Sequence, residues 1–156
     1  MNCHFGTRLL NENGDWKTQT DMMNSVSDIS CVSGQMPRIV GLAYASKLYR
    51  NNKNLSDMEN FSINGNEVVF GTIGDASTSE GHFWEAINAC GVLQVPLIMS
   101  IWDDGYGISV PSEYHTTRND LSKALSGFQR SSKKENGYEI FTCLLYTSDA
   151  ADDHHR

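Results

Sequence analysis

Two apolar runs separated by a helical pattern dominate the centre of the chain. Residues 68–73 read VVFGTI and residues 97–102 read LIMSIW, each with the length of a buried strand. Between the two runs, apolar or small residues recur at the spacing of one helical face: Phe83, Ile87, Cys90 and Gly91. A strand, a helix and a strand in this order predict a βαβ unit, whose two strands run parallel.

Both predicted strands end at acidic residues. Asp75 follows the first strand, and Asp103 and Asp104 follow the second. The carboxyl ends of parallel strands lie at one edge of the sheet, where open α/β sheets bind ligands. Magnesium prefers oxygen ligands and often shares them with phosphates. The pattern therefore predicts a magnesium site with Asp75, Asp104 and the backbone carbonyl of Tyr106 as ligands.

The residues after Asp75 suit an anion. Ala76, Ser77 and Thr78 are small and precede the predicted helix, so a diphosphate can approach backbone N–H groups near the helix N-terminus. The 29 positions between the two aspartates fit one helix and one strand. An alternative interpretation keeps the aspartates as strand-end acids of some other nucleotide or phosphate binder.

The segments before the first strand predict a loop, a helix and two turns. Residues 25–34 are small and polar, as in a loop that lies over a ligand, and Pro37 suits the first turn of a helix. Asn13-Gly14 and Asn64-Gly65 predict turns. The buried stripe of the helix is expected at Ile39, Leu42, Ala43 and Tyr49.

The segments after the second strand predict less regular structure. Residues 105–117 are expected to form a loop, and Asn119 is expected to cap a helix. Residues 138–142 resemble a third strand. His82 and His115 are expected at the surface. The apolar face of the capped helix would consist of Leu121, Ala124, Leu125 and Phe128.

Composition narrows the class of protein. A chain of 156 residues allows one domain or part of one. The net charge of −7 and a pI near 5.1 disfavour nucleic acid as a partner. No apolar run approaches the ~18 residues of a membrane span, and no secretory signal is recognisable. The four cysteines are far apart, which is typical of reduced thiols and predicts a cytoplasmic protein.

The last 14 residues have a different character. Residues 143–156 read CLLYTSDAADDHHR, which resembles the translation of a sequencing-library adaptor. Such a tail carries no information on the fold. We therefore expect a partial domain over residues 1–142 and a non-native tail over residues 143–156. The alternative is a genuine polar C-terminus.

The central stretch resembles a known family. Residues 74–109 read GDASTSEGHFWEAINACGVLQVPLIMSIWDDGYGIS, which is similar to the thiamine-diphosphate motif of Gly-Asp-Gly, a helix and strand, then Asn-Asn before Gly-Tyr. The run from Tyr106 to Pro111 and the upstream GQMP at 34–37 resemble the α half of the dehydrogenase E1 component of 2-oxo-acid dehydrogenase complexes. The resemblance extends from about His4 to Thr142. It implies an α/β fold, a partial thiamine-diphosphate-binding domain with a parallel sheet and flanking helices.

The resemblance also implies site residues and cofactors. Mg²⁺ would be held by Asp75, Asp104 and the Tyr106 carbonyl. Thiamine diphosphate would contact the backbone of Gly74, Ala76 and Ser77, with Val32 near its aminopyrimidine. The resemblance leaves the catalytic residues unassigned apart from His4, which resembles a histidine of the family's cofactor-proximal loop.

The family's reaction implies partners. A 2-oxo acid is oxidatively decarboxylated, and its acyl group passes to lipoamide on the acyltransferase component, so the enzyme is an oxidoreductase with a disulfide as acceptor. The resemblance implies an oligomer with the E1 β half, fused or separate, which contributes the glutamate that activates the aminopyrimidine. Neither nucleic acid nor a membrane is expected as a partner. Other interpretations are a transketolase-like or acetoin-cleaving thiamine enzyme, or a fragment with no activity of its own.

Three departures from the family pattern are visible. Trp102 stands where some relatives place an arginine that pairs with phosphate. Ala76 replaces the third glycine of the motif, which places a β-carbon near the expected diphosphate. Asp103-Asp104 replaces Asn-Asn, which adds negative charge beside an anion. The stretch Asp-Asp-Gly-Tyr-Gly resembles the bacterial members of the family, where others carry Asn-Asn-Gly-Tyr-Ala.

Overall fold

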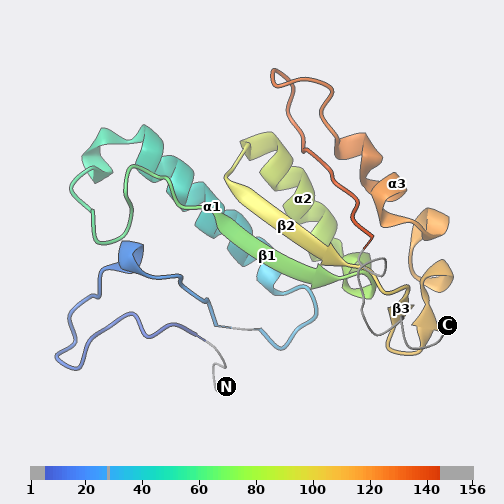
Figure 1. Ribbon diagram of the computed structural model, residues 1–156, viewed down its shortest axis with the longest axis horizontal. Helices are drawn as coiled ribbons and strands as arrows, with labels where there is room; N and C mark the ends of the chain where they lie inside the picture. Colours follow the sequence, from blue (N-terminus) through green and yellow to red (C-terminus); the bar gives the residue numbers. More distant parts are fainter. Residues whose placement is uncertain (1–5, 28, 145–156) are drawn as a thin grey trace, which may run out of the picture.

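The computed structural model describes residues 6–27 and 29–144 (Figure 1). Three helices and two pairs of short strands follow one another along the chain. In chain order they are α1 (Gln35–Asn51), β1 (Val69–Gly74), α2 (Gly81–Leu93), β2 (Leu97–Trp102), β3 (Tyr106–Gly107), β4 (Val110–Pro111) and α3 (Leu121–Leu125). Within the described ranges, every helix is too short or too polar to cross a membrane.

The predicted βαβ unit is confirmed. β1 and β2 pair in parallel, with a register that runs from Val69 opposite Leu97 to Gly74 opposite Trp102. The α2 helix connects them and ends at Gln94, whose left-handed backbone (φ 49°) lets its N–H bond to the Cys90 carbonyl. Because the strands are parallel and in register, Asp75 and Asp103 leave the sheet at the same edge.

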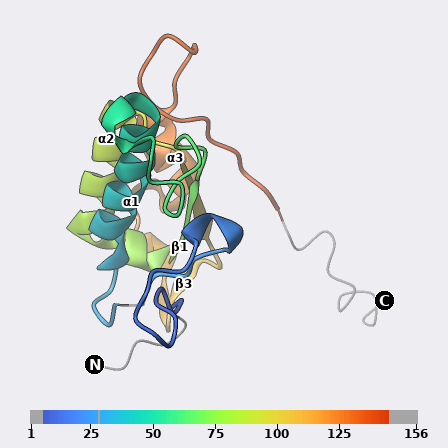
Figure 2. The same ribbon diagram turned by 90° about the vertical axis from the view of Figure 1, so that its left-hand side faces the viewer.

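Both long helices cover the same face of this sheet. Figures 1 and 2 show α1 behind β1 and α2 behind β2, on one side of the strands. Apolar burial between these layers drives the packing. The core comprises Met36, Ile39, Ile73, Phe83, Ala86, Ile87 and Leu125. The predicted apolar face of α2 is therefore confirmed, since Phe83, Ile87, Cys90 and Gly91 are all buried.

The opposite face of the sheet is exposed. Phe70 and Ile98 are neighbours on the two strands, and both are largely accessible to solvent. Trp102, at the end of β2, is exposed in the same way. A parallel sheet is ordinarily covered on both faces. The arrangement is thus a two-layer α/β unit with one apolar sheet face uncovered by the described residues.

The α1 helix begins where Pro37 predicts, but its buried stripe differs from the prediction. Ile39 and Ala43 are buried as expected, whereas Leu42 is 40% exposed and Tyr49 is only half-buried. Met36 and Ser46 complete the buried face instead. Ser46 is buried because its hydroxyl donates to two carbonyl oxygens of the following segment, a pairing that hydropathy does not reveal.

That segment folds back onto α1 through the predicted turn at Asn64-Gly65. Gly65 has a φ of +65°, and a β-carbon at this position would lie 2.3 Å from the Ser46 carbonyl oxygen. The Arg50 guanidinium donates to the Gly65 carbonyl at 2.6 Å. Glu67 closes the turn by accepting from the Ser62 hydroxyl and the Ile63 N–H. Glycine is required here because the turn approaches the helix backbone so closely.

Three predictions for the later part of the chain are wrong. Residues 105–117 are not purely loop, because β3 and β4 pair as a small antiparallel hairpin. Asp120, not Asn119, caps α3, since its carboxylate accepts the Lys123 N–H at 3.0 Å. Residues 138–142 form no strand and make one isolated bridge, from Tyr138 to Gln129. There the Tyr138 side chain packs on α2 and takes the place of a strand pairing.

Candidate functional site

Asp75 lies buried at the carboxyl end of β1. Its backbone N–H donates to the Trp102 carbonyl at 3.0 Å, which ties it to the end of β2. The residue is only 4% exposed, and its Oδ2 atom has no hydrogen-bond partner among the described residues. Burial raises the pKa of this carboxyl, and the charges of Asp103 and Asp104 raise it further, against the lowering effects of the Ala76 N–H and His115. A buried, unpartnered carboxylate oxygen is costly unless the carboxyl takes up a proton or a cation pairs with it.

A single tight turn separates Asp75 from α2. Residues Ala76–Ser79 form a 3-10 turn, and α2 starts only at Gly81 with Glu80 as its N-cap. The small residues Ala76, Ser77 and Thr78 thus precede the helix, as expected. Thr78 is buried, and both its N–H and its hydroxyl donate to the Asp75 carbonyl, at 3.0 and 2.5 Å. These bonds fix the backbone immediately beside the carboxylate.

The loop before α1 contacts this turn. The Ser33 hydroxyl donates to the Ser77 carbonyl at 2.6 Å. Ser33 is 2% exposed and has a φ of 59°, an uncommon backbone conformation for a residue with a side chain. Val32, the predicted neighbour of the aminopyrimidine, is exposed on the same loop. Part of the loop predicted to lie over a ligand is therefore held against the turn predicted to face the diphosphate.

The acids after β2 are exposed and lie in the turn that leads to β3. Asp103 accepts the Gly105 N–H, and Asp104 accepts the Tyr106 N–H, both at 3.0 Å. Ser112 N–H donates to the Gly105 carbonyl, which makes Tyr106 and Pro111 a non-hydrogen-bonded pair of the hairpin. The N–H and carbonyl of Tyr106 consequently point away from β4, toward the side where Asp104 lies.

His115 is a residue of this site that the sequence did not reveal. It was expected at the surface, but its side chain is only 12% exposed and its Nε2 atom lies 4.0 Å from Asp75 Oδ2. Its carbonyl accepts a hydrogen bond from the Ser79 hydroxyl at 2.8 Å. The prediction failed because nothing local to the sequence at His115 indicates a contact with a turn so far away along the chain. The other surface prediction holds, since His82 is exposed.

Ala76 faces the hairpin rather than open space. A β-carbon placed at Gly107 would lie 2.6 Å from the Ala76 Cβ, far inside normal contact. Ala76, which departs from the family's third glycine, and Gly107, which resembles the bacterial members, therefore fit together at this contact. The expected crowding of the diphosphate by Ala76 is reduced, because its methyl group is directed at the space left by Gly107.

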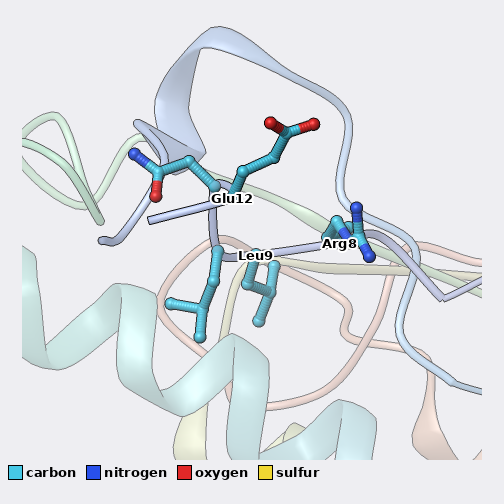
Figure 3. Close-up of a pocket in the computed structure, with 5 residues that line it drawn as sticks. Arg8, Leu9 and Glu12 are labelled. Atoms are coloured by element: carbon cyan, nitrogen blue, oxygen red, sulfur yellow. The ribbon is translucent and has the colours of Figure 1, made fainter. Parts of the chain in front are cut away.

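Two surface hollows occur in the described residues. The larger, about 700 Å³, is formed by five consecutive residues of one segment, Arg8 to Glu12 (Figure 3). It lies on the N-terminal segment, and its only charged lining residues are Arg8 and Glu12. The second, about 570 Å³, is lined by Thr78, Ser79, Trp84, His115 and neighbouring residues of 116–126. Its lining includes Thr78 and His115, which contact or approach Asp75, but none of the predicted magnesium or diphosphate residues lines it.

The arrangement can hold a hard dication. Within residues 6–27 and 29–144, no three His, Cys, Asp or Glu side chains already converge as a metal site. Asp75 nevertheless provides an unpartnered buried oxygen in a field made negative by Asp103 and Asp104. The donor set of carboxylates and a backbone carbonyl suits Mg²⁺, which completes its shell with water or phosphate oxygens. His4, the remaining candidate, lies outside the described residues.

Comparison with known proteins identifies the class. Residues 6–155 match the family described as Dehydrogenase E1 component. The match covers nearly the whole chain, so the chain belongs to this family. The α/β fold with a parallel sheet and flanking helices, expected from the resemblance, agrees with that membership.

Individual relatives are α subunits of dehydrogenases. The chain is 26% identical over 121 residues to the mitochondrial 2-oxoisovalerate dehydrogenase subunit alpha of Homo sapiens, an alignment that covers 78% of this chain and 24% of the relative. It is 30% identical over 112 residues to the protein of the same name from Caenorhabditis elegans, covering 72% and 20%. It is 24% identical over 89 residues to the 3-methyl-2-oxobutanoate dehydrogenase subunit alpha of Mycobacterium tuberculosis (strain ATCC 25618 / H37Rv), covering 57% and 24%. The chain thus spans about a quarter of the length of these relatives.

Proposed function

We propose that this chain supplies the cation and diphosphate portion of a thiamine-diphosphate site in the α half of a 2-oxo-acid dehydrogenase E1 component. The observation that carries the proposal is the buried Asp75 carboxylate, whose Oδ2 is without a partner at the end of β1. The family match gives the class of enzyme, and the position of Asp75 supports the proposed role of this portion of it.

The cation would be held by oxygen atoms from both strand ends. Asp75 contributes a carboxylate that is already buried and whose Oδ2 has no hydrogen-bond partner among the described residues. Asp104 and the Tyr106 carbonyl lie on the outer side of β3, on the segment that follows β2. Binding would draw Asp104 from its bond with the Tyr106 N–H, so we expect Mg²⁺ to order this turn.

The diphosphate would lie against the turn that begins at Gly74. Gly74 presents no side chain, and Ala76 and Ser77 are half-buried and small. Ser33 holds this turn through the Ser77 carbonyl, and a bound diphosphate would compete with the Asp75 carboxylate for the Ala76 N–H. Val32 would contact the aminopyrimidine from the same loop.

The reaction proposed is oxidative decarboxylation of a 2-oxo acid with acyl transfer to lipoamide. Thiamine diphosphate, when bound, supplies the carbon nucleophile and the electron sink that the loss of a carboxylate requires. The residues of this chain bind and orient that cofactor, and proton transfer is left to groups outside the described residues. The names of the relatives, which refer to 2-oxoisovalerate and 3-methyl-2-oxobutanoate, support a branched-chain 2-oxo acid as substrate.

Partner chains would complete the site. Trp102, Tyr106, Ile108 and Tyr114 are exposed aromatic or aliphatic side chains at or just beyond the strand ends. Exposed apolar clusters of this kind mark interaction surfaces. They support an E1 β half that covers the cofactor, in an oligomer that meets a lipoyl-bearing acyltransferase. The relatives are named as alpha subunits, which agrees with such a division.

A cytoplasmic location stays a prediction. The thiols of Cys31, Cys90 and Cys143 are free, which agrees with the reduced cysteines on which that prediction rests.

Calorimetric titration of the chain with thiamine diphosphate tests this proposal. Binding should require a divalent cation, and a chelator should abolish it. Thiamine monophosphate is the matched control, because it carries the same rings but one phosphate fewer. Equal binding of the two compounds, or binding that survives the chelator, would contradict a cation-bridged diphosphate site.

A further inference from the structure

Two buried polar atoms face each other beside the strand ends without a partner. Asp75 Oδ2 and His115 Nε2 are both inaccessible to solvent, and neither has a hydrogen-bond partner among the described residues. They lie 4.0 Å apart, which is beyond hydrogen-bond distance. Buried polar atoms are almost always satisfied, so these two either form an ion pair with each other when the imidazole is protonated or share a group bound between them.

The imidazole of His115 is held with Nε2 toward that gap. Nδ1 lies 2.9 Å from the Thr116 hydroxyl, and the ring packs against Gly107, where a β-carbon would lie 3.8 Å from Nε2. When Nδ1 carries the proton and donates to Thr116, Nε2 presents its lone pair to the Asp75 carboxylate. Metal-binding histidines are typically oriented in this way, by a hydrogen bond at the second ring nitrogen.

Charge favours a dication over a water molecule in the gap. Asp75 is buried near two further carboxylates, Asp103 and Asp104, whose charges act on it. Metal–nitrogen and metal–oxygen bonds of about 2.0–2.2 Å each would together span the separation of Nε2 and Oδ2. One ion can therefore contact both atoms with little movement of either side chain.

We propose that His115 Nε2 is a ligand of the cation that Asp75 holds, and that this nitrogen gives the site a preference for Co²⁺ over Mg²⁺. The inference rests on the proposed cation site and adds a ligand to it. Imidazole nitrogen suits transition-metal dications, whereas Mg²⁺ is bound almost entirely by oxygen. His115 thereby sets which metal the site selects.

The test compares Co²⁺ and Mg²⁺, each added alone, by calorimetry and by the visible spectrum of Co²⁺. The chain has five histidines, so His4→Gln, His154→Gln and His155→Gln are introduced first, leaving only His82 and His115. His115→Gln should then weaken Co²⁺ binding at least tenfold and Mg²⁺ binding less than about threefold, since even outer partners of metal ligands contribute ~10–100-fold. His82→Gln, at an exposed position of α2, is the matched control and should change neither affinity.

Two results would overturn the inference. One is unchanged Co²⁺ affinity in His115→Gln; the other is an equal loss for Co²⁺ and Mg²⁺, which would indicate a packing role. Asp75→Asn separates this from failure of the proposed function. If Asp75→Asn loses both ions while His115→Gln loses neither, only the role of His115 is wrong; if Asp75→Asn keeps both, the cation site itself is wrong.

A measurement without substitution of His115 covers the case in which that variant does not fold. In the chain with His82 and His115 only, NMR of the Co²⁺ form should show one strongly shifted, exchangeable imidazole N–H signal, from the Nδ1–H of a coordinated ring. The signal should persist in His82→Gln. A spectrum with no such signal at saturating Co²⁺ contradicts coordination by His115.

Discussion

The Cβ of Ala76 occupies the space that a side chain at Gly107 would need, with 2.6 Å between Ala76 Cβ and a β-carbon built at Gly107. The turn after β1 and the hairpin after β2 thus fit together because Ala76 has a methyl group where Gly107 has no side chain. Family members with the Asn-Asn-Gly-Tyr-Ala pattern have the opposite arrangement. They carry glycine at the position of Ala76 and alanine at the position of Gly107. The exchange keeps the total volume at this contact constant.

A double-mutant cycle tests this pairing. Gly107→Ala alone should destabilise the chain by about 1–3 kcal/mol, because the added methyl group overlaps with Ala76. Adding Ala76→Gly should recover most of that loss, a coupling within the ~0.5–3 kcal/mol known for residues in contact. Urea unfolding of the four proteins measures it. Additive effects of the two substitutions would show that the residues do not meet.

Ser33 should anchor the loop to the diphosphate turn. Ser33→Ala removes the hydroxyl that donates to the Ser77 carbonyl, so a buried acceptor loses its donor, at about 1–3 kcal/mol. Ser56→Ala is the control, since Ser56 makes an exposed, local bond to Lys53 and should change stability by no more than ~0.5 kcal/mol. The free energy of unfolding distinguishes them. If Ser33→Ala lost no more unfolding free energy than the control, Ser33 would not anchor the loop to the turn.

Asp75 should stabilise ligand binding at the expense of the unliganded fold. Its pKa in the folded chain is raised above the ordinary 3.8, so the folded state holds the proton more tightly than the unfolded state does. The contribution of Asp75 is therefore favourable at low pH and is lost as the pH rises through the folded pKa. Asp75→Asn should raise stability at neutral pH by about 0.5–2 kcal/mol, with little gain in acid.

The control for this prediction is Asp57→Asn, at an exposed position. That variant should show no comparable gain at any pH. The comparison is made by thermal unfolding of both variants across roughly pH 3–8, a range that includes the titration of carboxyl groups. A loss of stability in Asp75→Asn at neutral pH would mean that the carboxylate has a favourable partner in the unliganded chain.

Glu67 should show the opposite pH dependence. Burial alone would raise its pKa, but the hydrogen bonds from Ser62 and Ile63 outweigh this and lower it below 4.5. Its stabilisation is therefore complete above the unfolded pKa and is lost as the pH falls through the folded value. Glu67→Gln should cost about 1 kcal/mol at pH 7, and the difference from the wild type should vanish in acid. The exposed Glu59→Gln is the control, and a pH-independent difference for Glu67→Gln would contradict the role assigned to its charge.

The sequence predicts the parts of this fold that depend on local pattern. The βαβ unit follows from two apolar runs and one helical face, and the turn at Gly65 follows from Asn-Gly. Asp75 and the acids after β2 could be placed at one edge because parallel strands force their carboxyl ends together. The third strand was predicted from the same kind of pattern, but Tyr138 instead donates a hydrogen bond to the Ile87 carbonyl of α2.

The contacts that complete the site were not predictable in this way. His115 meets Asp75, and Ser33 meets Ser77, across long stretches of chain and through single side chains. Neither contact produces a periodicity or a motif. The contact of Ala76 with Gly107 was not predictable either, because only the folded arrangement places the two residues beside each other.

The most direct test of the central claim is Mg²⁺-dependent binding of thiamine diphosphate, measured by calorimetry on the wild-type chain, Asp75→Ala and Asp104→Asn. Asp75→Ala should abolish binding, because it removes the one buried carboxylate at the site. Asp104→Asn should bind as tightly as the wild type or more tightly, since it keeps an oxygen ligand and removes a negative charge beside the diphosphate. Wild-type affinity in Asp75→Ala, or no binding by the wild-type chain at saturating Mg²⁺, would contradict the account.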